Sequence, residues 1–232
     1  MTISSLQPPV LSVLAEGQAP HVTRARVYGQ TDASVETYRI VETFPHDVND
    51  YTEGLFIHDG HLYEATGEYG KSRLKKSNLA TGEVICERCL DGRYFGEGAA
   101  ALDDKVYRLT YLSIHGFIYR AEDLELESSF RYPGQGWGVT TDGKHLIMSN
   151  GSAAILFLNP RTCEVEHYIV VEDAYSEVDF LNELQYVDGE IYANVWKTNY
   201  SCASRPRRGK STAGSISTGS TPIPRASSIP TC

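Results

Sequence analysis

Asp59-Gly60-His61-Leu62-Tyr63 joins a polar turn to an apolar pair of the kind that opens a β-strand. The same pattern returns at Asp103-Asp104-Lys105-Val106-Tyr107, Asp142-Gly143-Lys144-His145-Leu146 and Asp188-Gly189-Glu190-Ile191-Tyr192. Its apolar positions, 62, 106, 146 and 191, are 44, 40 and 45 residues apart. One four-stranded blade of a β-propeller takes about 40 to 50 residues. The repeat therefore predicts an all-β fold built as a β-propeller.

A second repeat supports the same architecture. The segments Asn78-Leu79-Ala80-Thr81-Gly82-Glu83-Val84 and Asn159-Pro160-Arg161-Thr162-Cys163-Glu164-Val165 resemble one outer hairpin turn in two different blades. Between such turns the chain alternates short apolar segments with Gly, Asp or Asn every 8 to 12 residues. This pattern is typical of short antiparallel strands, and no long helical period competes with it. A β-sandwich with coincidental spacing is the alternative.

Composition limits the classes of protein that the chain can represent. Its 232 residues are 41% hydrophobic, which is enough to bury a sizeable core. A formal charge of -9 argues against nucleic acid as the partner, because phosphate binding requires clustered Lys and Arg. No segment approaches the roughly 20 apolar residues of a membrane-spanning helix. We expect a monomer without nucleic-acid or membrane partners. The N-terminus has no signal-peptide pattern and predicts no export, but the compartment stays open.

The cysteines and histidines form no recognisable metal site. Five cysteines are an odd number, which favours free thiols. Cys86 and Cys89 have C-x-x-C spacing, but zinc would need a second ligand pair that the sequence lacks, so we interpret them as incidental thiols near the end of a strand. The sequence contains no H-E-x-x-H motif, no G-x-S-x-G elbow and no phosphate loop. It predicts no metal ligand and no cofactor needed for catalysis. Whether a structural metal lies in the central channel of the propeller is left open.

Periodicity and composition divide the chain into three parts. Residues 1–37 are rich in Pro, Ala, Ser and Thr and are expected to be a flexible lead-in. Residues 38–200 hold the propeller pattern. Residues 201–232 contain no acid, no aromatic residue, no Leu and no Val, and we expect them to be disordered.

The start of this last part suggests a shifted reading frame. Read one base earlier, the codons from Ser201 onward permit an apolar strand, and those from Pro206 to Ile216 permit Pro-Glu-Glu-Gly-Lys-Val-Asp-Gly-Trp-Ile-Asp. That sequence would supply another outer turn and strand. We interpret residues 201–232 as an out-of-frame tail, whether the frameshift is natural or a sequencing error.

The stretch Tyr94-Phe95-Gly96-Glu97-Gly98 sets one carboxylate between an aromatic residue and two glycines. Burial beside aromatic rings raises the pKa of a carboxyl group, and flanking glycines let a substrate approach the backbone. Glu97 is therefore a candidate catalytic acid. The alternative for this motif alone is an ordinary turn with a solvated acid.

Eight motifs together carry a family resemblance. They are, in order, Phe44-Pro45-His46-Asp47, Tyr51-Thr52-Glu53-Gly54-Leu55, Glu64-Ala65-Thr66-Gly67, Tyr69-Gly70-Lys71-Ser72, Phe95-Gly96-Glu97-Gly98, Gly136-Trp137-Gly138, Leu181-Asn182-Glu183-Leu184 and Ala193-Asn194-Val195-Trp196. Their order and spacing resemble those of the plant and bacterial glutamine cyclotransferases from about Tyr38 to Tyr200. The resemblance implies a five-bladed β-propeller, here with about four blades and its last blade replaced by the tail.

The resemblance also implies a reaction. Members of the family convert the N-terminal glutamine of peptides or proteins to pyroglutamate and release ammonia. The implied catalytic residues are Glu97, as the acid, and Asn182, at the reacting amide. The positions implied for substrate binding are Tyr51, Glu53, Phe95, Tyr111, Trp137 and Trp196.

Three of these positions depart from the family pattern. Tyr111 stands where Trp is common, Tyr51 replaces a Phe, and Glu53 stands where Gln is usual. The aromatic exchanges are mild. A carboxylate at position 53 would favour the protonated form of the substrate's α-amine, whereas only the neutral amine can attack.

The family's final blade carries a lysine that completes the site, and nothing in this sequence matches it. We therefore expect the chain as given to be inactive and poorly soluble, with sheet edges unpaired. The alternative function is a non-catalytic propeller that binds peptides or protein partners.

Overall fold

The computed structural model describes residues 34–36, 39–173, 176–198, 200–206 and 211–218, with side chains from residue 39 to residue 206 within these ranges. The expected flexible lead-in lies outside these ranges, apart from a short strand, β1 (Ser34–Glu36). Those three residues are paired rather than free, because β1 runs parallel to β17.

Sixteen strands of the described residues form four groups of four antiparallel strands, and the described residues contain no helix. The first is β2 (Thr52–His58), β3 (His61–Thr66), β4 (Arg73–Asn78) and β5 (Val84–Cys89). The second is β6 (Gly96–Leu102), β7 (Lys105–Thr110), β8 (His115–Arg120) and β9 (Leu126–Arg131). The third is β10 (Val139–Thr141), β11 (Leu146–Ser149), β12 (Ala154–Leu158) and β13 (Val165–Glu172). The fourth is β14 (Leu181–Val187), β15 (Glu190–Val195), β16 (Tyr200–Ser204) and β17 (Ser211–Thr218).

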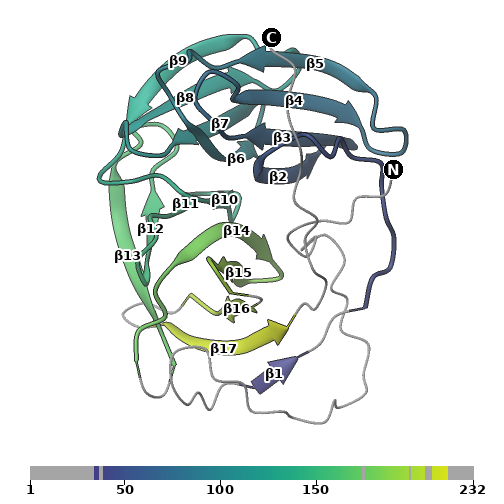
Figure 1. The fold of residues 1–232 in the computed structure, drawn as a ribbon. Helices are drawn as coiled ribbons and strands as arrows, with labels where there is room; N and C mark the ends of the chain where they lie inside the picture. Colours follow the sequence, from purple (N-terminus) through teal and green to yellow (C-terminus); the bar gives the residue numbers. More distant parts are fainter. Residues whose placement is uncertain (1–33, 37–38, 174–175, 199, 207–210, 219–232) are drawn as a thin grey trace.

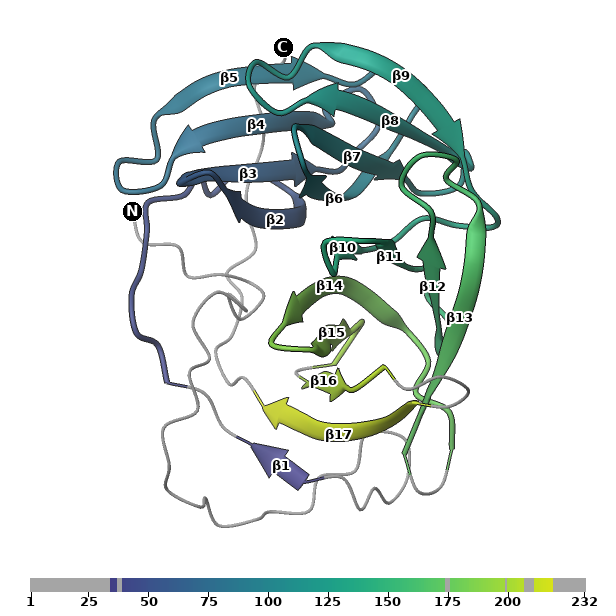
Figure 2. The same ribbon diagram turned by 180° about the vertical axis from the view of Figure 1, so that it is seen from behind.

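Each group of four strands is one blade of a propeller. Figure 1 shows the four blades following one another around an arc, with β2, β6, β10 and β14 innermost and β5, β9, β13 and β17 outermost. The view from behind in Figure 2 shows the same order. Blades three and four also share an edge, because β13 and β17 pair in parallel. The predicted all-β propeller with four blades is confirmed, and no helix in the described ranges could span a membrane.

The turns that set the repeat have the backbone geometry that their residues favour. Asp59 and Gly60 have φ angles of 47° and 73°, and Asp188 and Gly189 have 51° and 86°. Two positive φ angles in a two-residue hairpin define a type I′ turn, which Asp-Gly adopts readily and which suits the twist of the flanking strands. The repeated Asp-Gly pairs therefore mark the hairpins between the first and second strands of blades one and four.

The outer turns confirm the second repeat. Asn78 donates its N–H to the carbonyl of Glu83 (2.9 Å), and Asn159 does the same to Glu164 (2.9 Å). Both asparagine side chains also accept bonds from the following backbone N–H groups. Blade two has a third copy, in which Arg120 donates to the carbonyl of Glu125 (2.9 Å). Sequence reasoning missed this copy because no asparagine begins it.

The structure continues the fourth blade beyond the boundary expected at residue 200. Residues 201–204 lie in β16, which pairs with β15, and Cys202 is 1% exposed in the same core cluster as Ile191. Strand pairing uses backbone groups, so small residues such as Ser, Cys and Ala can supply a third strand although they have little apolar surface. β17 (Ser211–Thr218) completes the blade. The expected disorder of the remaining tail, residues 207–210 and 219–232, lies outside the described residues.

The hydrophobic core is divided among the contacts between successive blades. One cluster joins Phe56 and Leu74 of blade one to Val106 of blade two. A second joins blades two and three, and a third joins blades three and four. Blades four and one also meet, since Gln185 Nε2 of blade four donates to the carbonyl oxygen of Leu55 in blade one at 2.8 Å.

Truncating a core side chain tests the assignment of core residues. Leu74→Ala is expected to lower the free energy of unfolding by about 2–5 kcal/mol, because Leu74 is 0% exposed and its loss leaves a cavity. Urea denaturation followed by circular dichroism measures the change. Leu126→Ala, at a strand position that is 56% exposed, is the matched control and should cost far less. Equal losses for both variants would contradict the assigned core.

Candidate active site

Bulges near the starts of three inner strands place polar residues at one end of the blades. The pairing register shifts between Thr52 and Gly54 in β2, between Gly96 and Ala99 in β6, and between Leu181 and Leu184 in β14. Each shift adds one residue to the inner strand relative to its partner. Such bulges break the alternation of side chains and redirect them. The residues inside the three bulges are Glu53, Glu97, Gly98, Asn182 and Glu183.

Aromatic residues lie just outside the same strand ends. Because the strands of each blade are antiparallel, the start of its first strand and the end of its second lie at one end of the blade. The N–H of Tyr111 donates to the carbonyl of Phe95 (3.0 Å), and the N–H of Trp196 donates to that of Phe180 (2.9 Å). These equivalent bonds hold rings of blades two and four at the same level.

The rings form a continuous arc across the four blades. Phe95 contacts Tyr69 (5.4 Å between ring centroids) and Tyr111 (6.1 Å). Tyr111 lies 6.4 Å from Trp137, which in turn lies 5.4 Å from Trp196. We call these rings, together with Tyr51 beside Phe95 and Phe180 beside Trp196, the aromatic arc. Tyr51, Tyr69, Phe180 and Trp196 are exposed, so the arc faces solvent on part of its surface.

Three carboxyl groups lie close to one another at this end of the blades. Glu97 is 6% exposed and hydrogen-bonds Glu53 of the neighbouring blade. A Cβ atom built on Gly98 would lie 2.7 Å from Oε2 of Glu183, which places this third carboxyl beside the bulge of β6. Glu53 and Glu97 therefore meet directly, and Glu183 approaches from blade four.

Burial shifts the ionisation of all three groups. Burial, followed by the charges of Glu53 and Glu183, raises the pKa of Glu97 to about 10. Burial raises the pKa of Glu53 to about 7, although the hydrogen bond from Glu97 opposes this shift. Burial also raises the pKa of Glu183 well above its usual value, and the N–H of Leu55 offsets part of the effect. At neutral pH the site thus holds a protonated Glu97 beside a Glu53 that titrates.

Among the described residues around the three carboxyl groups, one cationic side chain faces them. Arg108 of β7 is fully buried, and its Nη2 donates to the carbonyl of Thr66 at 2.8 Å. Burial lowers the pKa of its guanidinium to about 10, and the nearby Tyr119 hydroxyl opposes this shift. Arg108 therefore remains positive at neutral pH, and its charge lowers the pKa of Glu97.

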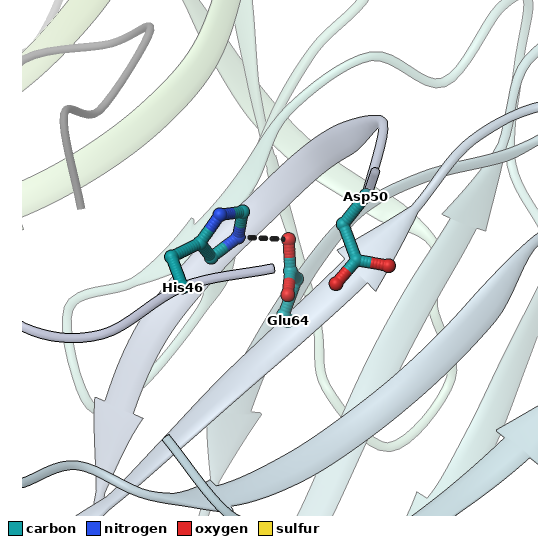
Figure 3. Close-up of side chains that lie close together, drawn as sticks. All are labelled: His46, Asp50 and Glu64. Atoms are coloured by element: carbon teal, nitrogen blue, oxygen red, sulfur yellow. Dashed lines mark hydrogen bonds and ion pairs between the residues drawn. The ribbon is translucent and has the colours of Figure 1, made fainter. Parts of the chain in front are cut away.

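A separate polar cluster lies in the first blade. Figure 3 shows the side chains of His46, Asp50 and Glu64 close together. One potential metal-ligand atom from each residue lies within 4.8 Å of the other two. His46 Nε2 lies 2.7 Å from Glu64 Oε1, and Thr52 also hydrogen-bonds that oxygen. The ammonium of Lys75 binds both oxygens of Asp50. Because a lysine already neutralises Asp50, the donor set fits an ion-pair network better than a metal site.

Of the residues named from the sequence, the structure links Tyr51, Phe95, Tyr111, Trp137 and Trp196 by ring contacts, and Glu53 by its bond to Glu97. Asn182 is buried in the bulge of β14, directly before Glu183, and its carbonyl accepts a bond from Ser149 Oγ (2.7 Å). The catalytic and binding roles of all these residues stay predictions. Cys86 and Cys89 lie in β5 and are not joined in a disulfide.

Sequence reasoning assigned no role to four residues of the site: Tyr69, Arg108, Phe180 and Glu183. Tyr69 and Glu183 lie inside motifs that carried the resemblance. The positions of Arg108 and Phe180 had no local signal, because their contacts come from other strands and other blades.

The blades, the bulged inner strands and the buried carboxyl beneath aromatic rings define a propeller whose candidate active site lies at one end of its inner strands. The family model of glutamine cyclotransferase matches residues 10–220, and the chain belongs to this family.

Individual relatives agree with this assignment. The chain is 35% identical over 177 residues to the glutaminyl-peptide cyclotransferase of Arabidopsis thaliana, covering 75% of this chain and 55% of that protein. It therefore spans about half the length of this curated relative. The crystal structure of Myxococcus xanthus glutaminyl cyclase is similar, with a TM-score of 0.73, 27% identity, and coverage of 81% of this chain and 78% of that one. The WD40 repeats of RRP9 match with a TM-score of 0.52 at 8% identity, over 72% of this chain and 52% of theirs, which shows the fold alone.

The raised pKa values predict how stability depends on pH. A carboxyl group whose pKa is higher in the folded state binds more protons there, so its stabilisation is complete below about pH 4.5 and is lost as pH rises. We expect the free energy of unfolding to fall by more than about 1 kcal/mol between pH 5 and pH 8. His46 acts in the same direction, because its hydrogen bond to Glu64 raises its pKa.

Glu183→Gln isolates the carboxyl contribution to this dependence. The variant cannot ionise, so urea denaturation should show a smaller loss between the two pH values than the unchanged chain. An undiminished loss in Glu183→Gln would show that Glu183 is not a buried group with a raised pKa.

Proposed function

We propose that this chain is a glutaminyl-peptide cyclotransferase, an aminoacyltransferase that cyclises the N-terminal glutamine of peptides or proteins to pyroglutamate and releases ammonia. The observation that carries the proposal is Glu97, a buried acid with a raised pKa beside the aromatic arc, in a chain of this family. The curated relative bears the name of this activity.

The reaction needs an acid more than it needs a nucleophile. The substrate's α-amine has an ordinary pKa of about 8, so part of it is neutral near physiological pH. Its attack on the γ-carboxamide is intramolecular and closes a five-membered ring. Ammonia leaves readily only after the amide nitrogen gains a proton. Glu97 holds a proton at neutral pH and can give it to that nitrogen.

Other residues orient the substrate and stabilise charge. The oxygen of the γ-carboxamide becomes negative as the ring closes, and a fixed donor such as the side-chain amide of Asn182 would stabilise it. Phe95, Trp137 and Trp196 would hold the narrow end of the substrate and exclude water. Catalysis by these groups requires no metal or cofactor.

The test is release of ammonia and pyroglutamyl product from a glutamine-initiated dipeptide. The N-acetylated dipeptide is the matched control, because its nitrogen cannot attack. The assay compares the 232-residue chain with a version whose reading frame is restored after codon 200. Turnover by either chain that acetylation abolishes supports the proposal. No ammonia from either chain would contradict it and would favour peptide binding without turnover.

A further inference from the structure

Glu53 lies against Gly67 and Glu97. It is the additional residue in the bulge of β2, and its carboxyl group hydrogen-bonds that of Glu97 in the neighbouring blade. A Cβ atom built on Gly67 would lie 3.0 Å from Cγ of Glu53 and 2.7 Å from Cε1 of Phe95. Glu53 is therefore held between Gly67 and Glu97, and a larger residue at position 67 would displace it.

The groups facing this carboxyl pair come from several elements. Glu183 faces it from β14 and Arg108 from β7. Tyr132, which follows β9, is 4% exposed, and burial raises the pKa of its hydroxyl to about 12, with the charge of Glu97 adding to the shift. Tyr51 stands at the exposed side and feels the charges of both carboxyl groups. Three carboxyl groups thus share one guanidinium, and like charges at short range cannot all be ionised.

We propose that Glu53 and Glu97 share one proton and act together as the proton-transfer pair of the reaction proposed above, on which this inference rests. In this step the neutral α-amine forms a bond to the carbonyl carbon of the γ-carboxamide and gives a proton to the carboxylate of Glu53. Glu97 gives its proton to the amide nitrogen, the bond between that nitrogen and the carbonyl carbon breaks, and ammonia leaves. The pair has gained one proton and lost one, and the proton on Glu53 returns to Glu97 through their hydrogen bond.

The pair removes a difficulty of a single acid. Glu97 alone can give its proton to the amide nitrogen, but while it holds that proton it cannot accept one from the α-amine. A singly protonated pair presents a base and an acid at the same time, so both transfers can accompany ring closure. Glu53 is then a catalytic residue rather than a charge that hinders the substrate's amine.

The first test needs no turnover. Infrared difference spectroscopy of the carboxyl bands follows ionisation in the resting chain as pH changes. In Glu53→Gln, Glu97 loses the neighbouring negative charge, so its ionisation should move to lower pH and one titration step should disappear. Glu68→Gln removes a carboxyl group close to Tyr51 and should leave the titration of Glu97 unchanged. An unchanged titration of Glu97 in Glu53→Gln would overturn the shared proton.

The second test uses the pH profile of kcat at saturating glutamine dipeptide. The wild-type profile should be bell-shaped, since the pair works only with one proton bound. Glu53→Gln should lower kcat by about 10-fold or more. It should also remove the low-pH limb of the profile, where protonation of Glu53 removes the base. Glu53→Asp keeps an ionisable group and should restore that limb in part. If Glu53 only holds the amine in its protonated form, Glu53→Gln would instead have unchanged or higher activity at neutral pH, and this outcome would overturn the proposal.

The two tests separate this inference from the function on which it rests. No ammonia from the wild-type chain or its frame-restored version overturns the proposed function together with the catalytic use of the pair. The infrared titration then still decides whether Glu53 and Glu97 share a proton. Turnover by wild type with an unaffected Glu53→Gln variant overturns the pair and leaves the proposed function standing.

Discussion

Replacing Glu97 by Gln is expected to lower kcat for a glutamine-initiated dipeptide by about 100-fold or more. Gln has nearly the same size and can still hydrogen-bond Glu53, but it cannot give up and regain a proton. The substrate would still contact the aromatic arc, so KM should change much less than kcat. Steady-state ammonia release, measured with the chain that turns over in the assay above, gives both constants.

The matched control for Glu97→Gln is Glu83→Gln, at an exposed position on the outer turn of blade one. This variant makes the same chemical change far from the aromatic arc and should keep kcat and KM. If Glu97→Gln retained nearly full activity, the proton would have to come from another group, and the assignment of the catalytic acid would be wrong.

Gly138→Ala should destabilise the fold strongly. A Cβ atom at this position would lie 2.3 Å from the carbonyl oxygen of Asn182 and 2.6 Å from Cα of Glu183. Both atoms belong to the backbone of β14, which cannot rotate away as a flexible side chain can. Blades three and four would have to separate at their inner strands, at a cost of about 3 kcal/mol or more. Urea denaturation measures the loss, and displacement of Asn182 should also lower activity.

A second glycine provides the comparison for Gly138→Ala. The nearest atom to a Cβ built on Gly92 is Cα of Gly70 at 3.4 Å, an ordinary van der Waals distance. Gly92→Ala should therefore change the free energy of unfolding by less than about 1 kcal/mol. Similar stabilities for the two variants would show that the inner strands do not approach as closely as described.

The sequence predicted the parts of the fold that depend on local chemistry. Asp59-Gly60 and Asp188-Gly189 determine their turns through their own backbone preferences, so the repeat was visible without knowledge of the strand partners. The asparagine turns at positions 78 and 159 are local in the same way. The structure differs from the boundary expected at residue 200 for the opposite reason. The composition of a segment indicates how much apolar side-chain surface it can bury. β16 is instead held in its blade by backbone hydrogen bonds to β15.

The site was predictable in its residues but not in its arrangement. Glu97 stood out because of its aromatic and glycine neighbours. The hydrogen bond between Glu53 and Glu97 could not be foreseen, because it depends on bulges in two strands from different blades. The approach of Glu183 and the burial of Arg108 arise in the same manner, from packing between segments that are far apart in the chain.

The two tryptophans of the chain, Trp137 and Trp196, both belong to the aromatic arc. Their ring planes are inclined by 77°, and the ammonium of Lys197 lies 4.2 Å from the centre of the Trp196 ring. One tryptophan belongs to blade three and the other to blade four. Tryptophan fluorescence and the exciton coupling of the two indoles in circular dichroism therefore report on the site itself, without an introduced label. The same signals record any change in the placement of these two blades relative to each other.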